Sequence, residues 1–125
     1  MNVVDSCGWL EYFADGANAD KFAAAIEDTQ QLIVPVISIF EVFKRVLQQR
    51  GEDAALQAVA IMSQGQVIDL DMSLALMAAK LSAELKMPMA DSIILTTARQ
   101  YHAVVLTQDN DFEGVAGVEY FKKVT

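Results

Sequence analysis

The chain has few of the residues that cross-link, interrupt or loosen a fold. Its 125 residues include one cysteine, two prolines and six glycines. Because Cys7 has no partner within the chain, an internal disulfide is excluded, and with no signal-peptide pattern at its start we expect a cytoplasmic protein. The glycines are scattered singly, which excludes a glycine-rich loop of the kind that binds nucleotide phosphates.

Long apolar runs and flexible linkers are also missing. The longest largely apolar run, residues 32–40, is far shorter than the roughly 20 residues that cross a bilayer, so no membrane contact is expected. No repeat, low-complexity tract or Ser/Gly-rich linker divides the chain. Hydrophobic residues make up 54% of it, which is enough for a packed core. We therefore predict a single domain over residues 1–125.

Positive charge is scarce. Nine lysines and arginines stand against 17 aspartates and glutamates, and the formal net charge is −8. Proteins that bind nucleic acids usually carry a basic surface, so this balance counts against simple electrostatic capture of RNA or DNA. It counts less against a metal-dependent nuclease, because bound cations offset part of the negative charge of its site.

Short apolar runs alternate with helical patterns along the chain. Strands are predicted at residues 1–4, 32–37, 66–70 and 103–107, with an edge strand at 118–124. Helices are predicted at residues 6–14, 20–27, 39–49, 52–63, 73–86 and 91–101. Strands separated by helices indicate parallel pairing, so we expect an α/β fold with helices on both faces of a central sheet.

Two helices carry more detailed signals. In the helix at 39–49, the helical spacing of four apolar residues predicts that they form its buried face: Phe40, Phe43, Val46 and Leu47. Ser73 is the expected cap of the helix at 73–86.

Four acidic residues stand at four separate junctions between these elements: Asp5, Glu41, Asp91 and Asp109. In open α/β sheets, ligands bind beyond the carboxyl ends of the strands. The helix at 91–101 leads almost directly into the strand at 103–107, so its N-terminus must lie at that same edge. The four carboxylates are therefore expected to converge, and such oxygen ligands suit a hard divalent cation, Mg²⁺ or Mn²⁺.

Each acid also has an ordinary structural explanation. Asp5 is a good N-cap for the following helix. Glu41 completes a capping box with Ser38, although one carboxylate can serve both a cap and a site. Asp91 suits the positive end of a helix dipole, and turn chemistry accounts for Asp109. Asp111 is a second candidate for the fourth acidic position.

The predicted convergence of the carboxylates also has an electrostatic consequence. Without cations, clustered carboxylates repel one another, and the pKa of at least one should rise. A bound cation would remove that conflict and could activate water for attack on a phosphodiester. Ser6 and Thr107 flank the edge and could hold a water on the metal, whereas Lys44 and Arg45 could grip phosphate.

Four segments, in this order and over nearly the whole chain, resemble the PIN domain family and its VapC-type toxin ribonucleases. They are Val-Val-Asp5-Ser6, Val34-Pro-Val-Ile-Ser-Ile-Phe-Glu41-Val, Met87-Pro-Met-Ala-Asp91-Ser-Ile-Ile and Leu106-Thr-Gln-Asp109-Asn-Asp-Phe112.

The resemblance implies a three-layer α/β/α sandwich whose central parallel sheet has about five strands in the order 3-2-1-4-5. It implies a Mg²⁺- or Mn²⁺-dependent endoribonuclease in which Asp5, Glu41, Asp91 and Asp109 form the catalytic, metal-binding quartet. Ser6 and Thr107 match the hydroxyls that accompany the first and last acids of the family's motif. The implied partners are an RNA substrate, a second copy of the chain in a homodimer, and a cognate antitoxin.

Two other classes of protein remain as alternatives. The same fold could act as a catalytically silent protein-binding module in which the acids are structural. An α/β phosphatase or receiver-like domain would use Asp5 as a phosphorylated nucleophile. A dehalogenase-like phosphatase, however, needs a second aspartate where Cys7 stands, and a receiver needs an acidic pair before Asp5. Cys7 itself is a poor candidate nucleophile, because His102 is the only histidine and lies at a helix-to-strand joint.

Overall fold

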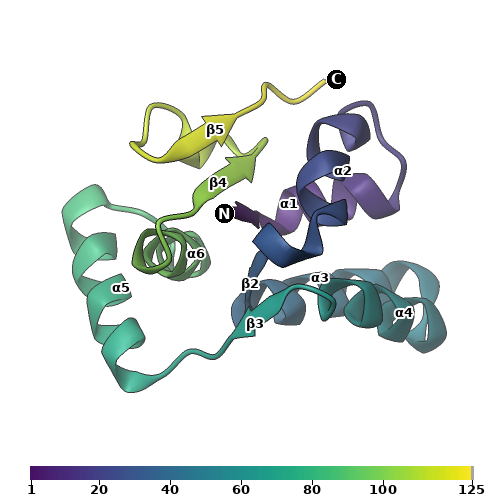
Figure 1. The fold of residues 1–125 in the computed structure, drawn as a ribbon, viewed down its shortest axis with the longest axis horizontal. Helices are drawn as coiled ribbons and strands as arrows, with labels where there is room; N and C mark the ends of the chain where they lie inside the picture. Colours follow the sequence, from purple (N-terminus) through teal and green to yellow (C-terminus); the bar gives the residue numbers. More distant parts are fainter. Residues whose placement is uncertain (125) are drawn as a thin grey trace.

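Short parallel strands lie at the centre of the molecule, and helices cover them on two sides (Figure 1). The computed structural model describes residues 1–124. Its strands are β1 (Asn2–Val4), β2 (Ile33–Pro35), β3 (Gln66–Ile68), β4 (Val104–Thr107) and β5 (Val118–Tyr120). Its helices are α1 (Ser6–Phe13), α2 (Ala19–Glu27), α3 (Val36–Arg50), α4 (Glu52–Met62), α5 (Met72–Leu85) and α6 (Met89–Gln100). Single 3₁₀ turns span Thr29–Gln31 and Asn110–Phe112.

The strands pair in parallel in two groups. β1 pairs with β4 and β4 with β5, whereas β2 pairs with β3. A single parallel bridge between Asn2 and Leu32 connects the two groups. The predicted mixed α/β class with parallel strands is confirmed, although the two groups of strands are joined by this one bridge and not by a full ladder.

Alternating residues of the strands supply two separate cores. Val4 and Val34 belong to one buried cluster, together with residues of α1 to α4. Val3 and Ile33 belong to the other, which includes Ile94 of α6. Successive side chains of a strand point to opposite faces, so β1, β2 and β4 each contribute to both clusters. This arrangement explains why the strands read as continuous apolar runs.

Gly8 lets α1 pack closely against its neighbours. A Cβ atom at this position would lie 2.7 Å from Cδ1 of Phe22 and 2.7 Å from Cγ1 of Val4, closer than carbon atoms can approach. The helix can therefore begin directly after β1 and stay against the core. This packing keeps Asp5 at the junction between β1 and α1.

The boundary between β2 and α3 lies earlier than predicted. The strand expected at residues 32–37 ends at Pro35, and α3 begins at Val36 instead of at residue 39. Proline has no N–H to donate and a fixed φ that suits the start of a helix, so it outweighs the strand preference of the following β-branched residues. Ser38 therefore lies inside the first turn of α3, and the predicted capping box with Glu41 is wrong.

The predicted buried face of α3 is right for only two of its four residues. Val46 is buried and Phe43 packs against the core, whereas Phe40 is 60% exposed and Leu47 is 40% exposed. The other buried residues of α3 are Ser38 and Val42. Both sides of this helix are apolar, so periodicity alone did not indicate which side faces the protein.

At the start of α5, the cap is Asp71 and not Ser73. The Asp71 carboxylate accepts a 2.8 Å hydrogen bond from the N–H of Leu74. The predicted edge strand at 118–124 is limited to β5, Val118–Tyr120. Within the described residues, every helix is too short or too polar to cross a membrane.

Candidate metal centre

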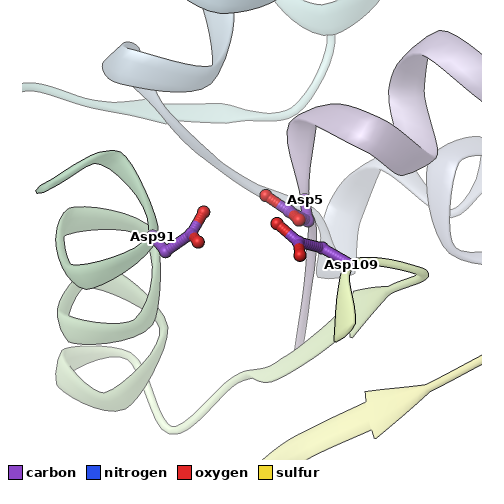
Figure 2. Close-up of side chains that lie close together, drawn as sticks. All are labelled: Asp5, Asp91 and Asp109. Atoms are coloured by element: carbon purple, nitrogen blue, oxygen red, sulfur yellow. The ribbon is translucent and has the colours of Figure 1, made fainter. Parts of the chain in front are cut away.

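Three carboxylates meet where β1, β4 and α6 come together (Figure 2). Asp5 follows β1, Asp109 follows β4, and Asp91 lies in the first turn of α6. One oxygen from each side chain lies within 4.8 Å of the other two. The structure thus brings together three of the four acids that the sequence analysis singled out.

Asp5 is the most constrained of the three. It is only 3% exposed, and its carboxylate accepts hydrogen bonds from three donors. Oδ1 accepts from the N–H of Ser6 at 2.8 Å, while Oδ2 accepts from the Thr107 hydroxyl at 2.8 Å and the Cys7 thiol at 3.2 Å. Asp5 therefore caps α1 and faces the acidic cluster at once. Such a buried and fully engaged carboxylate is poorly placed to become a phosphorylated nucleophile.

Thr107 connects Asp5 to Asp109. While its hydroxyl donates to Asp5, it accepts a 2.9 Å hydrogen bond from the N–H of Asp109. The Asp109 carboxylate in turn accepts from the N–H of Asp111 at 2.9 Å and so caps the following 3₁₀ turn. Asp111 is exposed and is not one of the three clustered acids.

Glu41 lies at the margin of the cluster and is not one of the three acids that meet within 4.8 Å. Its Oε1 atom accepts a 2.6 Å hydrogen bond from the Ser6 hydroxyl. Ser6 follows Asp5 directly, so it links α3 to the end of β1. The hydroxyls of Ser6 and Thr107 donate to carboxylates in this structure.

The cluster is electrostatically unfavourable by itself. Burial raises the pKa of Asp5 above its usual range. Burial, reinforced by the charges of Asp5 and Asp109 and more weakly by Asp111 and Glu41, raises the pKa of Asp91 to about 7. A divalent cation would relieve this repulsion, and carboxylate oxygens are the ligands that hard cations prefer. The donor set therefore fits Mg²⁺ or Mn²⁺, held by Asp5, Asp91 and Asp109.

Cys7 is a donor in this network and not a nucleophile. Burial, together with the charge of Asp5, raises the pKa of the Cys7 thiol to about 12, so the thiol keeps its proton at neutral pH. Its Sγ atom lies 3.2 Å from Asp5 Oδ2 and 3.3 Å from the hydroxyl oxygen of Thr107. The sequence analysis did not identify this contact with Asp5.

Asn18 is a second residue that the sequence analysis missed. It is buried, and its side-chain amide donates to Gln108 Oε1 at 2.9 Å and to the carbonyl oxygen of Lys122 at 3.1 Å. These bonds join the loop that carries Asp109 to the segment after β5. No local pattern predicts contacts between residues so far apart in the chain.

Comparison with known proteins identifies the class to which this architecture belongs. The family model of the PIN domain matches residues 3–118. The chain therefore belongs to the PIN domain family. Comparison with curated protein sequences finds no match.

Solved structures share the fold at low sequence identity. A toxin–antitoxin complex from Klebsiella pneumoniae matches with a TM-score of 0.80 and 22% identity over 95% of this chain and 96% of that one. VapC20 from Mycobacterium tuberculosis, described as a toxin that cleaves the sarcin–ricin loop, matches with a TM-score of 0.79 and 19% identity over 95% and 98%. DNA-bound VapBC from Salmonella typhimurium matches with a TM-score of 0.72 and 19% identity over 97% and 98%.

The raised pKa of Asp91 predicts how stability depends on pH when metal is removed with a chelator. Between its ordinary value of 3.8 and about 7, the folded chain holds a proton that the unfolded chain has lost. The free energy of unfolding should therefore fall as pH rises through this range. Replacing Asp91 with Asn should reduce the fall by on the order of 1 kcal/mol, because solvent screens a partly exposed carboxylate.

Urea unfolding at a series of pH values measures this effect. Asp53→Asn, which removes an exposed carboxylate of α4 outside the cluster, is the matched control. A wild-type chain whose stability rises through this pH range would contradict the prediction.

A metal-binding experiment distinguishes Asp109 from Asp111 as the third ligand of the cation. Mn²⁺ at a concentration about 100 times its dissociation constant should stabilise the wild type by roughly 3 kcal/mol, because it binds only the folded chain. Asp109→Asn should lose most of this stabilisation, and Asp111→Asn should keep it. Thermal unfolding with and without Mn²⁺ measures both. If Asp111→Asn alone loses the effect, Asp111 and not Asp109 holds the cation.

Proposed function

We propose that this protein is a single-domain, metal-dependent endoribonuclease and the toxin of a toxin–antitoxin pair. The observation that carries the proposal is the meeting of Asp5, Asp91 and Asp109 within 4.8 Å in a chain of the PIN domain family. One structural neighbour is described as cleaving the sarcin–ricin loop, which supports RNA as the class of substrate.

Each residue of the site has a proposed role in the reaction. Asp5, Asp91 and Asp109 hold the cation, and Glu41 completes the acidic quartet from α3. When bound, Mg²⁺ or Mn²⁺ would supply a more acidic water and offset the charge of the phosphodiester. The hydrogen bonds from Thr107 and Cys7 orient Asp5, and the bond from Ser6 orients Glu41. These contacts hold the carboxylates in fixed positions, which favours catalysis by a preorganised site.

An antitoxin partner is supported by the neighbours, several of which are toxin–antitoxin complexes. A cavity of about 400 Å³ between α1, α3 and α4 is the proposed contact region. Leu10, Phe13 and Ile61 give it apolar walls, and Arg45 and Arg50 also line it. Such a surface suits a segment that carries both apolar and acidic side chains.

A homodimer is the second proposed assembly, and α5 is its proposed contact surface. Figure 1 shows α5 at the edge of the molecule beside α6, the helix against which it packs. Met72 is 78% exposed and Leu76 is 65% exposed. They are four residues apart on the helix and so lie on one face. An exposed apolar face of this kind often marks a protein contact.

RNA cleavage tests the proposed activity. In Mg²⁺ or Mn²⁺, the wild type should cleave members of a panel of structured RNAs, and Asp91→Asn should lower the rate by at least about 100-fold, because the cation loses a ligand. Asp53→Asn, purified in the same way, should cleave like the wild type.

Equal cleavage by the wild type and Asp91→Asn would indicate a contaminating nuclease or a wrong site. If Mn²⁺ neither binds nor stabilises the chain, and Asp5→Asn leaves RNA cleavage unchanged, the protein is better explained as a binding module.

Light scattering after size-exclusion chromatography tests the dimer. Leu76→Glu should convert a dimer into a monomer, because it buries a charge in an apolar contact. Leu56→Glu introduces the same charge at an exposed position of α4 and should leave the dimer intact. A wild type that is monomeric at every concentration would contradict this assembly.

A further inference from the structure

A second cavity, of about 380 Å³, borders the acidic cluster on the side of β5. Asp109 and Cys7 line the part nearest the cluster, and Tyr120, Lys122 and Lys123 line the rest. Tyr120 lies opposite Thr107 in the pairing of β4 and β5. Because these strands are parallel, the residues after β5 emerge at the same edge of the sheet as Asp109.

The chemistry of this cavity differs from that of the rest of the chain. The protein has a net charge of −8 and nine basic residues in all, yet two exposed lysines stand next to each other here. Tyr120 adds a partly exposed aromatic ring, and Asn110 adds an amide. Aromatic rings that stack on bases and lysines that contact phosphates are the groups that bind single-stranded nucleic acid.

The segment that carries the lysines is held in place by contacts on both sides. The N–H of Phe121 donates to the carbonyl oxygen of Thr107 at 2.8 Å, and the Asn18 amide donates to the carbonyl oxygen of Lys122 at 3.1 Å. The Phe121 ring meets the Phe22 ring edge-to-face at 5.5 Å between centroids. The positions of Lys122 and Lys123 relative to Asp109 are thus set by the fold.

We infer that this cavity is a nucleotide subsite, which binds the RNA residue next to the one whose phosphodiester lies at the carboxylates. Tyr120 stacks on its base, and Lys122 and Lys123 contact the adjoining phosphates. The inference rests on the proposed ribonuclease function and adds to it the direction in which the strand leaves the centre. It also explains how a strongly acidic protein holds RNA, since the positive charge is placed next to the point of cleavage.

Binding of a short, fluorescently labelled single-stranded RNA of mixed sequence tests the subsite. The titrations use the Asp91→Asn protein with Mn²⁺, so that the RNA is not cut, and they are repeated over a range of salt concentrations. Lys122→Ala and Lys123→Ala should each reduce the slope of log affinity against log salt by about 0.7, because one phosphate contact is lost. Lys86→Asn removes the charge of an exposed lysine at the C-cap of α5, in a left-handed conformation that asparagine tolerates, and should leave the slope unchanged.

Two variants of Tyr120 test whether its ring stacks on a base. Tyr120→Ala should weaken RNA binding by at least about 5-fold through loss of stacking, and Tyr120→Phe should keep the affinity of the parent protein. In the active protein, the lysine variants should raise KM for RNA while kcat and Mn²⁺ binding stay unchanged. Urea unfolding of each variant shows that it remains folded.

The possible outcomes separate this inference from the proposed function. If the wild type does not cleave RNA and the parent protein does not bind it, the ribonuclease function itself is wrong. If RNA is bound and cleaved but the Lys122, Lys123 and Tyr120 variants behave like Lys86→Asn, only the subsite is wrong. Lys123 also borders the cavity proposed for the antitoxin. Loss of antitoxin binding with unchanged RNA binding would assign Lys123 to that partner and overturn the inference.

Discussion

The hydrogen bond from Thr107 to Asp5 joins the ends of two paired strands, and the geometry of the acidic centre depends on it. The Thr107 hydroxyl donates to the first acid and accepts from the backbone N–H of the last, Asp109, so one side chain ties the Asp5 carboxylate to the backbone of Asp109. It can do so because Leu106 is paired with Val4, which places the residues after β1 and β4 side by side. The register of β1 against β4 therefore determines where Asp5 lies relative to Asp109.

The acidic centre places several carboxylates in a buried region, where the ionised form of a carboxylate is disfavoured. A buried carboxylate needs hydrogen-bond donors or a cation to stay ionised. Burial raises the pKa of both Asp5 and Asp91. Three hydrogen-bond donors offset part of this rise at Asp5, whereas the charges of the neighbouring acids add to it at Asp91. We interpret this as local stability given up for function, which is common at active sites. The chain compensates with two apolar cores that hold the strands and helices in position.

Local patterns predicted some parts of the fold well and others poorly. The alternation of strands and helices led to the α/β class and to the expectation that four acids share one edge, of which Asp5, Asp91 and Asp109 meet within 4.8 Å. Glu41 was misjudged, because Ser38 and Glu41 fit a capping box in sequence although the helix begins three residues earlier, after Pro35. The inward face of α3 was predicted correctly at Phe43 and Val46 and wrongly at Phe40 and Leu47. Apolar residues occupy both of its sides, and only the neighbouring elements select the one that is buried.

The sequence by itself determined which side chains are candidates for the site: carboxylates at the junctions of a parallel α/β chain, in an order that resembles one family. Those features are local, since they depend on periodicity, on caps and on the polarity of short segments. Only the tertiary structure decided how the side chains meet. The bonds from Thr107 to Asp5, from Ser6 to Glu41 and from Asn18 to Lys122 connect different elements that are far apart in the chain. Such contacts depend on strand register and helix packing, which are set by the whole core at once.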